Sequence, residues 1–507
     1  MTVPYYDGVA QNANRQPDKL AAIDLATGRR LTYRMFDDRI ARLAGSLQER
    51  FGVRAGDRVA VLAPNGTDTF EVLFACGRLG AIFVPLNWRL ANPELAVIIG
   101  DCAPTVLIYD QDFTDQADAL LRRCEIPHGV QMGPVDSAYE ALANGPRRLA
   151  EPVRATLDDI STILYTSGTT GRPKGVIITH GMNLWNAING NPPGRVDPDT
   201  VFLTLLPLFH TGGLNVFAWP TFQVGGTVLV MRSFDAGETL RLIGDPGVGV
   251  THLFGVPANF QFMMQHKLFR ETGFSGVVYA GVGGAPTPGA ILAVWQAQGL
   301  VLQQAYGMTE TGPLVLMLDK SDAVRKAGAA GKPLLCTEVR LVRGDGADAG
   351  VGEVGELWVR GPNITPGYWQ RPEATDAAIT DGWLHTGDAA VMDGEGFYSI
   401  VDRWKDMYIS GGENVYPAEV ENVLYELEGV AEAGVIGVSD ARWGEVGRAI
   451  VVVKEGHVLT EEAVIGHCAA NLARFKLPHS VVFTEALPRN ATGKVHKPTL
   501  RSLFGVR

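Results

Sequence analysis

Residues 165–175 read YTSGTTGRPKG, which places three glycines, four serine or threonine hydroxyls, one arginine and one lysine within eleven positions. Glycine lets a backbone turn tightly and approach a ligand without a Cβ in the way. Hydroxyls donate hydrogen bonds, and lysine supplies a compact charge for phosphate oxygens. The stretch is therefore typical of a loop that wraps a polyphosphate. Its candidate phosphate-binding residues are Thr166, Ser167, Gly168, Thr169, Thr170, Gly171 and Lys174.

The segments that flank this loop are short, apolar and β-branched, with STILY before it (161–165) and VIIT after it (176–179). Both predict strands, so the order is strand, glycine loop, strand. The P-loop of nucleoside triphosphatases is excluded, because its GxxxxGK[ST] motif opens a helix and Pro173 stands where its second glycine belongs. For the loop taken alone, a solvated turn remains the alternative.

The composition is that of a globular protein with more than one domain. A chain of 507 residues is too long for one ordinary core, and roughly two to four domains are expected. No apolar run is long enough for a membrane span, and the opening residues lack the layout of a secretory signal. The five cysteines are scattered without a CxxC pair, which favours reduced thiols in a cytoplasmic protein. A net charge of −11 argues against a nucleic-acid groove.

The pattern of apolar and polar residues changes twice along the chain. Helical periodicity (34–51) alternates with apolar strands (57–64, 104–110, 225–231), which predicts layered α/β subdomains. Between about 334 and 360 the pattern predicts β-hairpins. After 406 a small α+β set follows, with helices expected at 418–429 and 460–475 and strands at 430–438 and 449–456. We expect an N-terminal domain (1–401), a charged, glycine-rich hinge (402–406) and a C-terminal domain (407–507).

Four further segments carry chemistry. QQAYGMTE (303–310) combines an aromatic ring, a glycine, a hydroxyl and a carboxylate, which suits base stacking, phosphate binding and a hard cation. TGD (386–388) presents a carboxylate that suits sugar hydroxyls, the hinge holds Arg403, Lys405 and Asp406, and PRNATGK (488–494) ends on Lys494. Each segment alone is explained as well by core packing, a turn or solvated charge. Together, in this order, they are not.

The five motifs closely resemble the adenylate-forming superfamily of acyl-CoA synthetases, adenylation domains and luciferases. The likeness runs along nearly the whole chain, from LTY (31–33) through GDRVAVLAPN (56–65) and GAIFVPLNWRL (80–90) to the tail. The resemblance implies a two-step reaction. A carboxylate attacks the α-phosphate of ATP to give acyl-AMP and pyrophosphate, with Mg²⁺ neutralising charge, and the thiol of coenzyme A then attacks the anhydride. A small C-terminal domain rotates between the two steps.

The resemblance also implies roles for individual residues. Lys494 would bridge carboxylate and phosphate, Thr309 would contact the α-phosphate, Glu310 would hold Mg²⁺, and Lys405 would be the hinge residue. The nucleotide would contact Gly283, Gly284, Ala285, Tyr306, Gly307, Asp388 and Arg403. Coenzyme A would contact Arg89, Gly411, Gly412, Phe475 and Lys476.

By the same resemblance, LPLFHTGGLNVF (206–217) lines the acyl pocket. The pocket residues would be Trp185, His210, Thr211, Gly212, Leu214, Ala280, Gly281 and Gly307, with His210 as a gate rather than a structural histidine. Amino acids are disfavoured because His210 follows Phe209 where amino-acid enzymes keep an acid. Dicarboxylates are disfavoured because no arginine occurs in these segments. Glycines 212, 213, 281 and 307 predict a roomy, apolar pocket, and fatty and aromatic acids both fit it.

Four functions share these motifs. The first is an acid–CoA ligase, the second loads a carrier-protein thiol, and the third oxidises acyl-AMP as luciferases do. The fourth is a non-catalytic binding protein, against which the intact Lys494, Glu310 and loop argue. The sequence leaves open whether the chain forms a homodimer.

Overall fold

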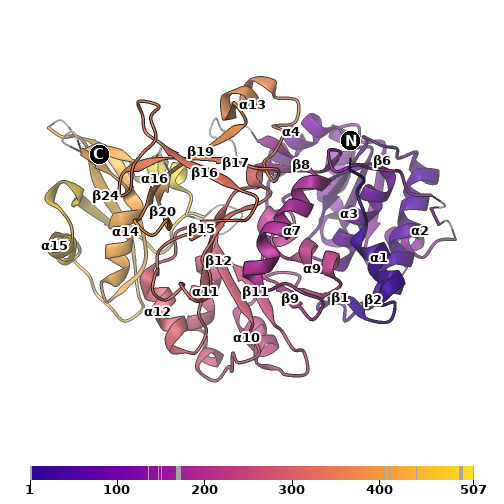
Figure 1. Ribbon diagram of the computed structural model, residues 1–507, viewed down its shortest axis with the longest axis horizontal. Coiled ribbons are helices and arrows are strands. Elements are labelled where there is room, and N and C mark those ends of the chain that lie inside the picture. Colours follow the sequence, from indigo (N-terminus) through magenta and orange to yellow (C-terminus); the bar gives the residue numbers. More distant parts are fainter. Residues whose placement is uncertain are drawn as a thin grey trace.

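The computed structural model describes residues 3–134, 136–146, 148–149, 151–166, 173–403, 406–410, 413–440, 442–489 and 495–505. The described residues form four β-sheets with helices packed against them. In Figure 1 the indigo N-terminal part lies at the right and the yellow C-terminal part at the left of the long axis. This architecture confirms the predicted class of α/β subdomains, a hairpin-rich part and a small C-terminal α+β part.

The first sheet carries the glycine loop on its last hairpin. Its strands run in the order β6 (His128–Met132), β5 (Val106–Asp110), β3 (Arg58–Leu62), β4 (Ile82–Pro85), β7 (Ile160–Thr166) and β8 (Lys174–Thr179). All neighbours are parallel except β7 and β8, which are antiparallel, so the predicted strand–loop–strand order is confirmed. One face packs on α4 (Asn92–Cys102) and α5 (Thr114–Arg123), and the other on α2 (Tyr33–Phe51) and α3 (Thr67–Leu79).

The second sheet is the largest. Its order is β15 (Lys332–Pro333), β14 (Leu314–Met317), β13 (Gln303–Gly307), β12 (Tyr279–Gly283), β11 (His252–Gly255), β9 (Val201–Thr204), β10 (Thr227–Val230), β1 (Leu20–Asp24) and β2 (Arg30–Thr32), parallel from β13 to β1. One face packs on α10 (Ala236–Gly244), α11 (Pro257–Gln265) and α12 (Gly289–Ala297), and the other on α7 (His180–Gly194) and α9 (Ala218–Val224).

Side chains alternate between these two faces, as the pleat of a strand requires. Along β12, Tyr279 packs in the core shared with α7 and α9, while Ala280 and Val282 pack in the core shared with α10 to α12. The carboxyl ends of the parallel strands meet at one edge, where ligand sites of open α/β sheets form.

The third and fourth sheets complete the molecule. The third holds the predicted hairpins, with strands β16 (Glu338–Val342), β17 (Val354–Arg360), β19 (Trp383–Met392), β18 (Ile379–Thr380) and β20 (Tyr398–Arg403), next to α13 (Pro372–Ala378). The fourth holds β22 (Glu413–Val415), β21 (Tyr408–Ser410), β24 (Gly444–Val453), β23 (Val430–Asp440) and β25 (Pro478–Phe483), packed on α14 (Pro417–Glu426), α15 (Glu461–Asn471) and α16 (Lys497–Phe504). The boundary at 402–406 stays a prediction, with Trp404 and Lys405 outside the described residues.

Local chemistry explains where helices begin and end. Thr32 caps α2, since its Oγ1 accepts from the Met35 amide at 3.3 Å, and Gly52 ends the helix in the left-handed conformation. The helix expected at 460–475 ends earlier, at Asn471, because Leu472 turns extended and Arg474–Lys476 form a separate 3₁₀ turn, η4, before β25. The remaining short elements are α1 (Gly8–Arg15), α6 (Ala138–Ala143), α8 (Thr211–Leu214), η1 (Gln111–Phe113), η2 (Lys267–Arg270) and η3 (Thr309–Thr311).

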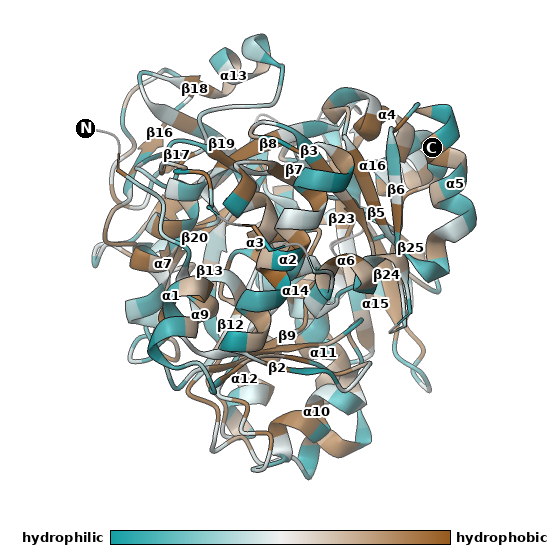
Figure 2. Cartoon of the chain, turned by 90° about the vertical axis from the view of Figure 1, so that its right-hand side faces the viewer, coloured by the Kyte–Doolittle hydropathy of each residue, from teal (hydrophilic) through white to brown (hydrophobic). Residues whose placement is uncertain are grey.

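Hydrophobic residues gather in the strands. Figure 2 shows mostly brown strands inside and teal on the outer helices and loops. Within the part of the chain that the structure describes, no helix has both the length and the apolar character needed to cross a membrane.

Candidate functional site

Three predicted nucleotide-binding residues meet in one hydrogen-bonded group. The Tyr306 hydroxyl, at the end of β13, donates to Asp388 Oδ2 at 2.6 Å, and Arg403 Nε lies 2.8 Å from Asp388 Oδ1. Asp388 and Arg403 are cross-strand partners in β19 and β20, so the sheet register sets their pairing. The nearby Asp388 carboxylate raises the pKa of the Arg403 guanidinium, while burial raises that of Tyr306. The group offers an aromatic face, a carboxylate and a fixed cation in one place.

A second group forms around Glu310, in the 3₁₀ turn η3. The carboxylate accepts from the Tyr368 hydroxyl at 3.0 Å, and Lys174 Nζ lies 5.0 Å from the centroid of the Tyr368 ring. Burial raises the pKa of the Glu310 carboxyl. Tyr368 was missed by the sequence reasoning, because its segment PGYW (366–369) carries no chemical signal by itself.

Glu310 fits the role of a magnesium ligand that needs substrate to complete it. Mg²⁺ at nucleotide sites usually binds through one or two carboxylates together with phosphate oxygens and water. The described residues hold no cluster of three or more histidine, cysteine or acidic side chains able to bind a metal without substrate. A single carboxylate that is 7% exposed and accepts from the Tyr368 hydroxyl is consistent with that chemistry.

The other predicted nucleotide contacts lie at the same edge of the second sheet. Gly283 ends β12 beside Ala305 of β13, and a Cβ on it would come within 2.5 Å of the Ala305 carbonyl oxygen. Gly284 follows with φ +82°, a conformation that favours glycine. Ala285 is partly exposed, and Thr309 is buried at the start of η3.

Several predicted residues cannot be placed. Thr166 and Lys174 are cross-strand partners where β7 ends and β8 begins, so the glycine loop starts from a fixed base. The other predicted residues lie outside the described part of the chain, namely Ser167, Gly168, Thr169, Thr170, Gly171, Lys405, Gly411, Gly412 and Lys494.

The predicted acyl segment forms a turn around α8. His210 caps this helix, and its Nδ1 accepts from the Gly212 amide at 3.3 Å. Thr211 is buried and donates to Asn215 at 3.2 Å, and Leu214 lies in the core with α7 and α9. Trp185, on α7, is partly exposed. His210 therefore holds a local structural role in addition to any role toward substrate.

The structure corrects the interpretation of the glycines. A Cβ on Gly281 would come within 2.5 Å of the Phe254 ring, and one on Gly212 within 2.9 Å of Leu206. A Cβ on Gly213 or Gly307 would collide with the carbonyl oxygens of Pro207 and Pro313, respectively. These glycines allow close packing of the protein on itself, so they do not indicate a roomy pocket.

The remaining residues predicted for the acyl pocket and for coenzyme A lie in different parts of the structure. Ala280 packs toward α10 to α12, on the face of β12 opposite to Gly281. Arg89 reaches the acyl segment after all, with its guanidinium 5.9 Å from the Phe209 ring centroid. It lines a cavity of about 230 Å³ together with Arg232 and Arg489.

Phe475 and Lys476 lie in η4, where Lys476 pairs with Glu419 at 2.5 Å and Phe475 is 37% exposed. Neither residue is among those that line the Arg89 cavity. In the present arrangement Phe475 and Lys476 therefore do not share the cavity that Arg89 lines.

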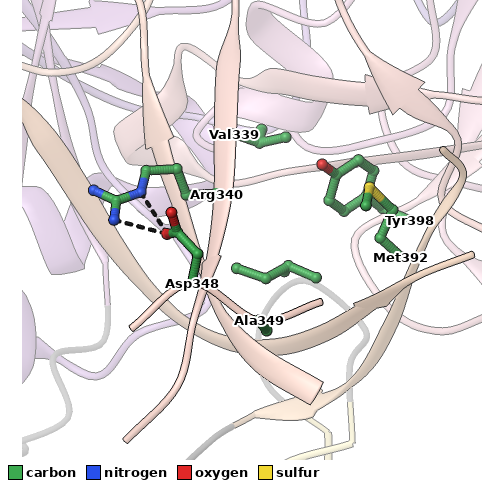
Figure 3. A pocket seen from close by; sticks show the side chains of 7 residues that line it. Val339, Arg340, Asp348, Ala349, Met392 and Tyr398 are labelled. Atoms are coloured by element: carbon green, nitrogen blue, oxygen red, sulfur yellow. Dashed lines mark hydrogen bonds and ion pairs between the residues drawn. The ribbon is translucent and has the colours of Figure 1, made fainter. Parts of the chain in front are cut away.

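A second cavity, of about 190 Å³, lies on the third sheet. Figure 3 shows Arg340 and Asp348 paired on one side of it and Tyr398 and Met392 on the other. It contains none of the predicted site residues, so it does not belong to the site described above.

Comparisons with known proteins agree along the whole chain. A family model described as AMP-binding enzyme matches residues 9–369, and its C-terminal domain model matches residues 419–494. The chain is 43% identical to a feruloyl-CoA synthase of an Amycolatopsis species, over 94% of this chain and 95% of that one. It is 38% identical to a long-chain-fatty-acid–CoA ligase of Mycobacterium tuberculosis, over 97% of both chains.

Two solved structures of MatB from Rhodopseudomonas palustris are also similar, at 32% identity and over 99% of both chains. The ATP-bound form matches with a TM-score of 0.91 and the apo form with 0.81.

Proposed function

The chain belongs to the AMP-binding enzyme family and is an acyl-CoA synthetase, and on that premise we propose that its acid substrate is a monocarboxylate with an apolar tail, aromatic or fatty. The observation that carries the proposal is the apolar core behind the acyl segment. There Leu214 and Phe217 are fully buried, and Phe217 packs on Tyr279 with ring centroids 5.0 Å apart.

In the first half-reaction two anions must meet, so the residues around them must neutralise charge. Asp388 and Arg403 hold the ribose, and Tyr306 stacks on the adenine and keeps Asp388 in place through its hydroxyl. Thr309, Lys174 and the glycine loop contact the phosphates, and Lys494 bridges carboxylate and α-phosphate. Such fixed, preorganised charges lower the barrier without reorganisation during the reaction.

Glu310 would hold a Mg²⁺ ion, which would supply Lewis-acid charge neutralisation at the phosphates. Tyr368 donates to the Glu310 carboxylate and so fixes its orientation. The Tyr368 ring also lies beside Lys174, which keeps that cation at the base of the loop.

The present domain arrangement belongs to the first half-reaction. The match to the ATP-bound MatB structure is better than to the apo structure, 0.91 against 0.81 in TM-score, at the same identity and coverage. The difference therefore comes from conformation. Contacts between the two parts, such as Gln261 Nε2 to the Ala431 carbonyl at 2.8 Å, belong to this arrangement.

In the second half-reaction the C-terminal part rotates and builds the coenzyme A site. Arg89 already lines a cavity beside the acyl segment, where guanidinium groups suit phosphate oxygens. Rotation brings Phe475 and Lys476 toward it, for stacking and for charge. Arg489 pairs with Glu432 at 3.0 Å in the present arrangement.

The class of acid follows from the cost of burying a charged group against the acyl segment. An ammonium or a second carboxylate buried against Leu214 and Phe217 without a partner would cost several kcal/mol, roughly a thousandfold in specificity. Arg89 approaches the segment at Phe209 but packs between that ring and Trp88, 4.9 Å from the indole.

A thioester assay tests this proposal. Purified enzyme with ATP, Mg²⁺ and coenzyme A should form acyl-CoA from hexanoate, benzoate or cinnamate, and should fail with malonate and with amino acids. Products are identified by mass spectrometry and rates are compared as kcat/KM. Comparable kcat/KM for malonate and hexanoate would reject the apolar monocarboxylate.

A further inference from the structure

The hydroxyl of Tyr279 is buried without a hydrogen-bond partner. The side chain lies in β12 and is 1% exposed, and no described residue bonds to its oxygen. Buried tyrosines normally find a partner for this group, because an unpaired buried hydroxyl is costly. Among the described residues, seven other buried side-chain polar atoms share this state, on Thr67, Asn92, His180, Asn191, Thr287, His385 and Tyr408.

The Tyr279 hydroxyl points along its own strand. A Cβ on Gly281 would lie 2.6 Å from the hydroxyl oxygen and 2.7 Å from Cε1 of the same ring. The ring therefore lies along the strand, over Gly281 and toward the carboxyl end of β12. That end carries Gly283, Gly284 and Ala285, which are predicted to contact the nucleotide. Gly281 is a predicted residue of the acyl pocket.

The surroundings of the hydroxyl are aromatic. The Tyr279 ring packs edge-on against Phe217 at 5.0 Å and stacks with His252 at 6.2 Å between centroids. Phe254, on β11, lies against Gly281 on the same face and packs on Phe217 at 6.1 Å. His252 is already satisfied, since its ring nitrogens lie 2.8 Å from Thr251 Oγ1 and 3.0 Å from the Gly194 carbonyl.

We propose that Tyr279 binds a hydroxyl group at the far end of the acid's tail, so that the preferred substrate is a hydroxylated aryl acid. This inference rests on the proposed function. Phe217 and Phe254 supply ring surface for an aromatic tail, and Tyr279 supplies one polar contact that a plain hydrocarbon lacks. A pocket that is mostly apolar with one placed polar group is typical of small-molecule selectivity.

The test compares two acids that differ by one oxygen, 4-hydroxycinnamate and cinnamate. The wild type should favour the hydroxylated acid by about tenfold in kcat/KM, the effect of one well-placed hydrogen bond. Tyr279→Phe should abolish this preference through KM for the hydroxylated acid, with kcat for cinnamate retained. Thr67→Val removes another unpartnered buried hydroxyl, in α3, and should leave the preference intact.

Each outcome decides the matter. Equal kcat/KM for the two acids in the wild type, or a preference that survives in Tyr279→Phe, overturns the assignment of Tyr279. Turnover of hexanoate with neither aryl acid accepted overturns it too, while the proposed function stands. Failure of every acid to form a thioester overturns the proposed function itself. Should Tyr279→Phe fail to fold, Gly281→Ala takes its place. Its Cβ would meet the Phe254 ring at 2.5 Å and the Tyr279 hydroxyl at 2.6 Å, so the readout is the ratio of kcat/KM for the two acids, which should fall towards one.

Discussion

We propose that Lys494 carries a charge that only one of the two half-reactions needs. Its ammonium group should stabilise the transition state in which carboxylate attacks phosphate, but it has no task once acyl-AMP exists. Lys494→Ala should slow acyl-AMP formation by roughly a hundredfold or more. Thioester formation from supplied acyl-AMP should stay close to wild type. Pyrophosphate release measures the first step and acyl-CoA the second.

Lys497→Ala is the control for this experiment, because it removes a nearby lysine and should not slow acyl-AMP formation selectively. Lys497, in α16, is paired with Glu421 at 3.2 Å and with Asp402 at 3.4 Å, so its charge is already satisfied within the protein. Loss of both half-reactions to the same extent in Lys494→Ala would contradict domain rotation as the way in which the lysine leaves.

Some residues predicted from a motif lie together in the structure, whereas contacts that depend on the fold were not predicted. Tyr306, Asp388 and Arg403 were predicted together and lie in one hydrogen-bonded group. Tyr368 was missed because only the fold brings it to Glu310. Gly307 was misinterpreted because a sequence does not reveal that Pro313 already fills the space beside it.

At the scale of elements, the predicted hinge between β20 and β21 should decide whether the second half-reaction occurs. Lys405→Pro should fix φ at about −65° there, so acyl-AMP should form at a near-normal rate while acyl-CoA formation falls at least tenfold. Lys405→Ala removes the same side chain without restricting φ, and should leave both steps active. Equal overall rates for the proline variant and the wild type would place the hinge at another residue.

The strands around the site were predictable because apolar runs flanked by glycine are strong signals, and β7 and β8 appear where expected. The end of α15 was not predictable. The sequence of residues 472–475 continues the helical pattern, but the chain turns there to reach β25. The prediction that Ala280 lines the acyl pocket overlooked the alternation of side chains along β12. Its neighbours in the strand face the opposite core.

At the scale of the whole molecule, a buried charge cluster makes stability depend on pH. It joins α2, α3, α6 and the β1–β2 turn through Arg29, Arg39, Asp68, Glu71 and Glu140. Burial, with repulsion from Glu71, raises the pKa of Asp68 to about 7 from 3.8. Between those values the unfolded chain releases a proton that the folded chain keeps, so stability falls as pH rises.

Asp68→Asn should therefore gain stability relative to the wild type as pH rises from 5 to 8, by roughly 1–3 kcal/mol. Thermal unfolding midpoints at the two pH values measure the gain. Asp18→Asn is the control, since Asp18 is 87% exposed in its pair with Arg34 and should show no pH-dependent gain. A constant difference between Asp68→Asn and the wild type at both pH values would contradict the raised pKa.

Whole-molecule organisation was predictable up to the relative placement of its parts. The change of texture near residue 406 indicated a separate C-terminal sheet, and such a sheet is present. How that sheet sits on the rest depends on surface contacts such as Gln261 to Ala431, which leave no pattern in a sequence.

The alternation along β12 has an evolutionary consequence. Tyr279 and Gly281 face the core shared with the acyl segment, while Ala280 and Val282 face the helices on the far side. Substitutions at Tyr279 or Gly281 would therefore change the side of β12 that faces the acyl segment, while Ala280 and Val282 keep their contacts with the helices on the far side. Relatives named for ferulate and for long-chain fatty acids match nearly the whole of this chain, which is consistent with one scaffold serving acids of different shape.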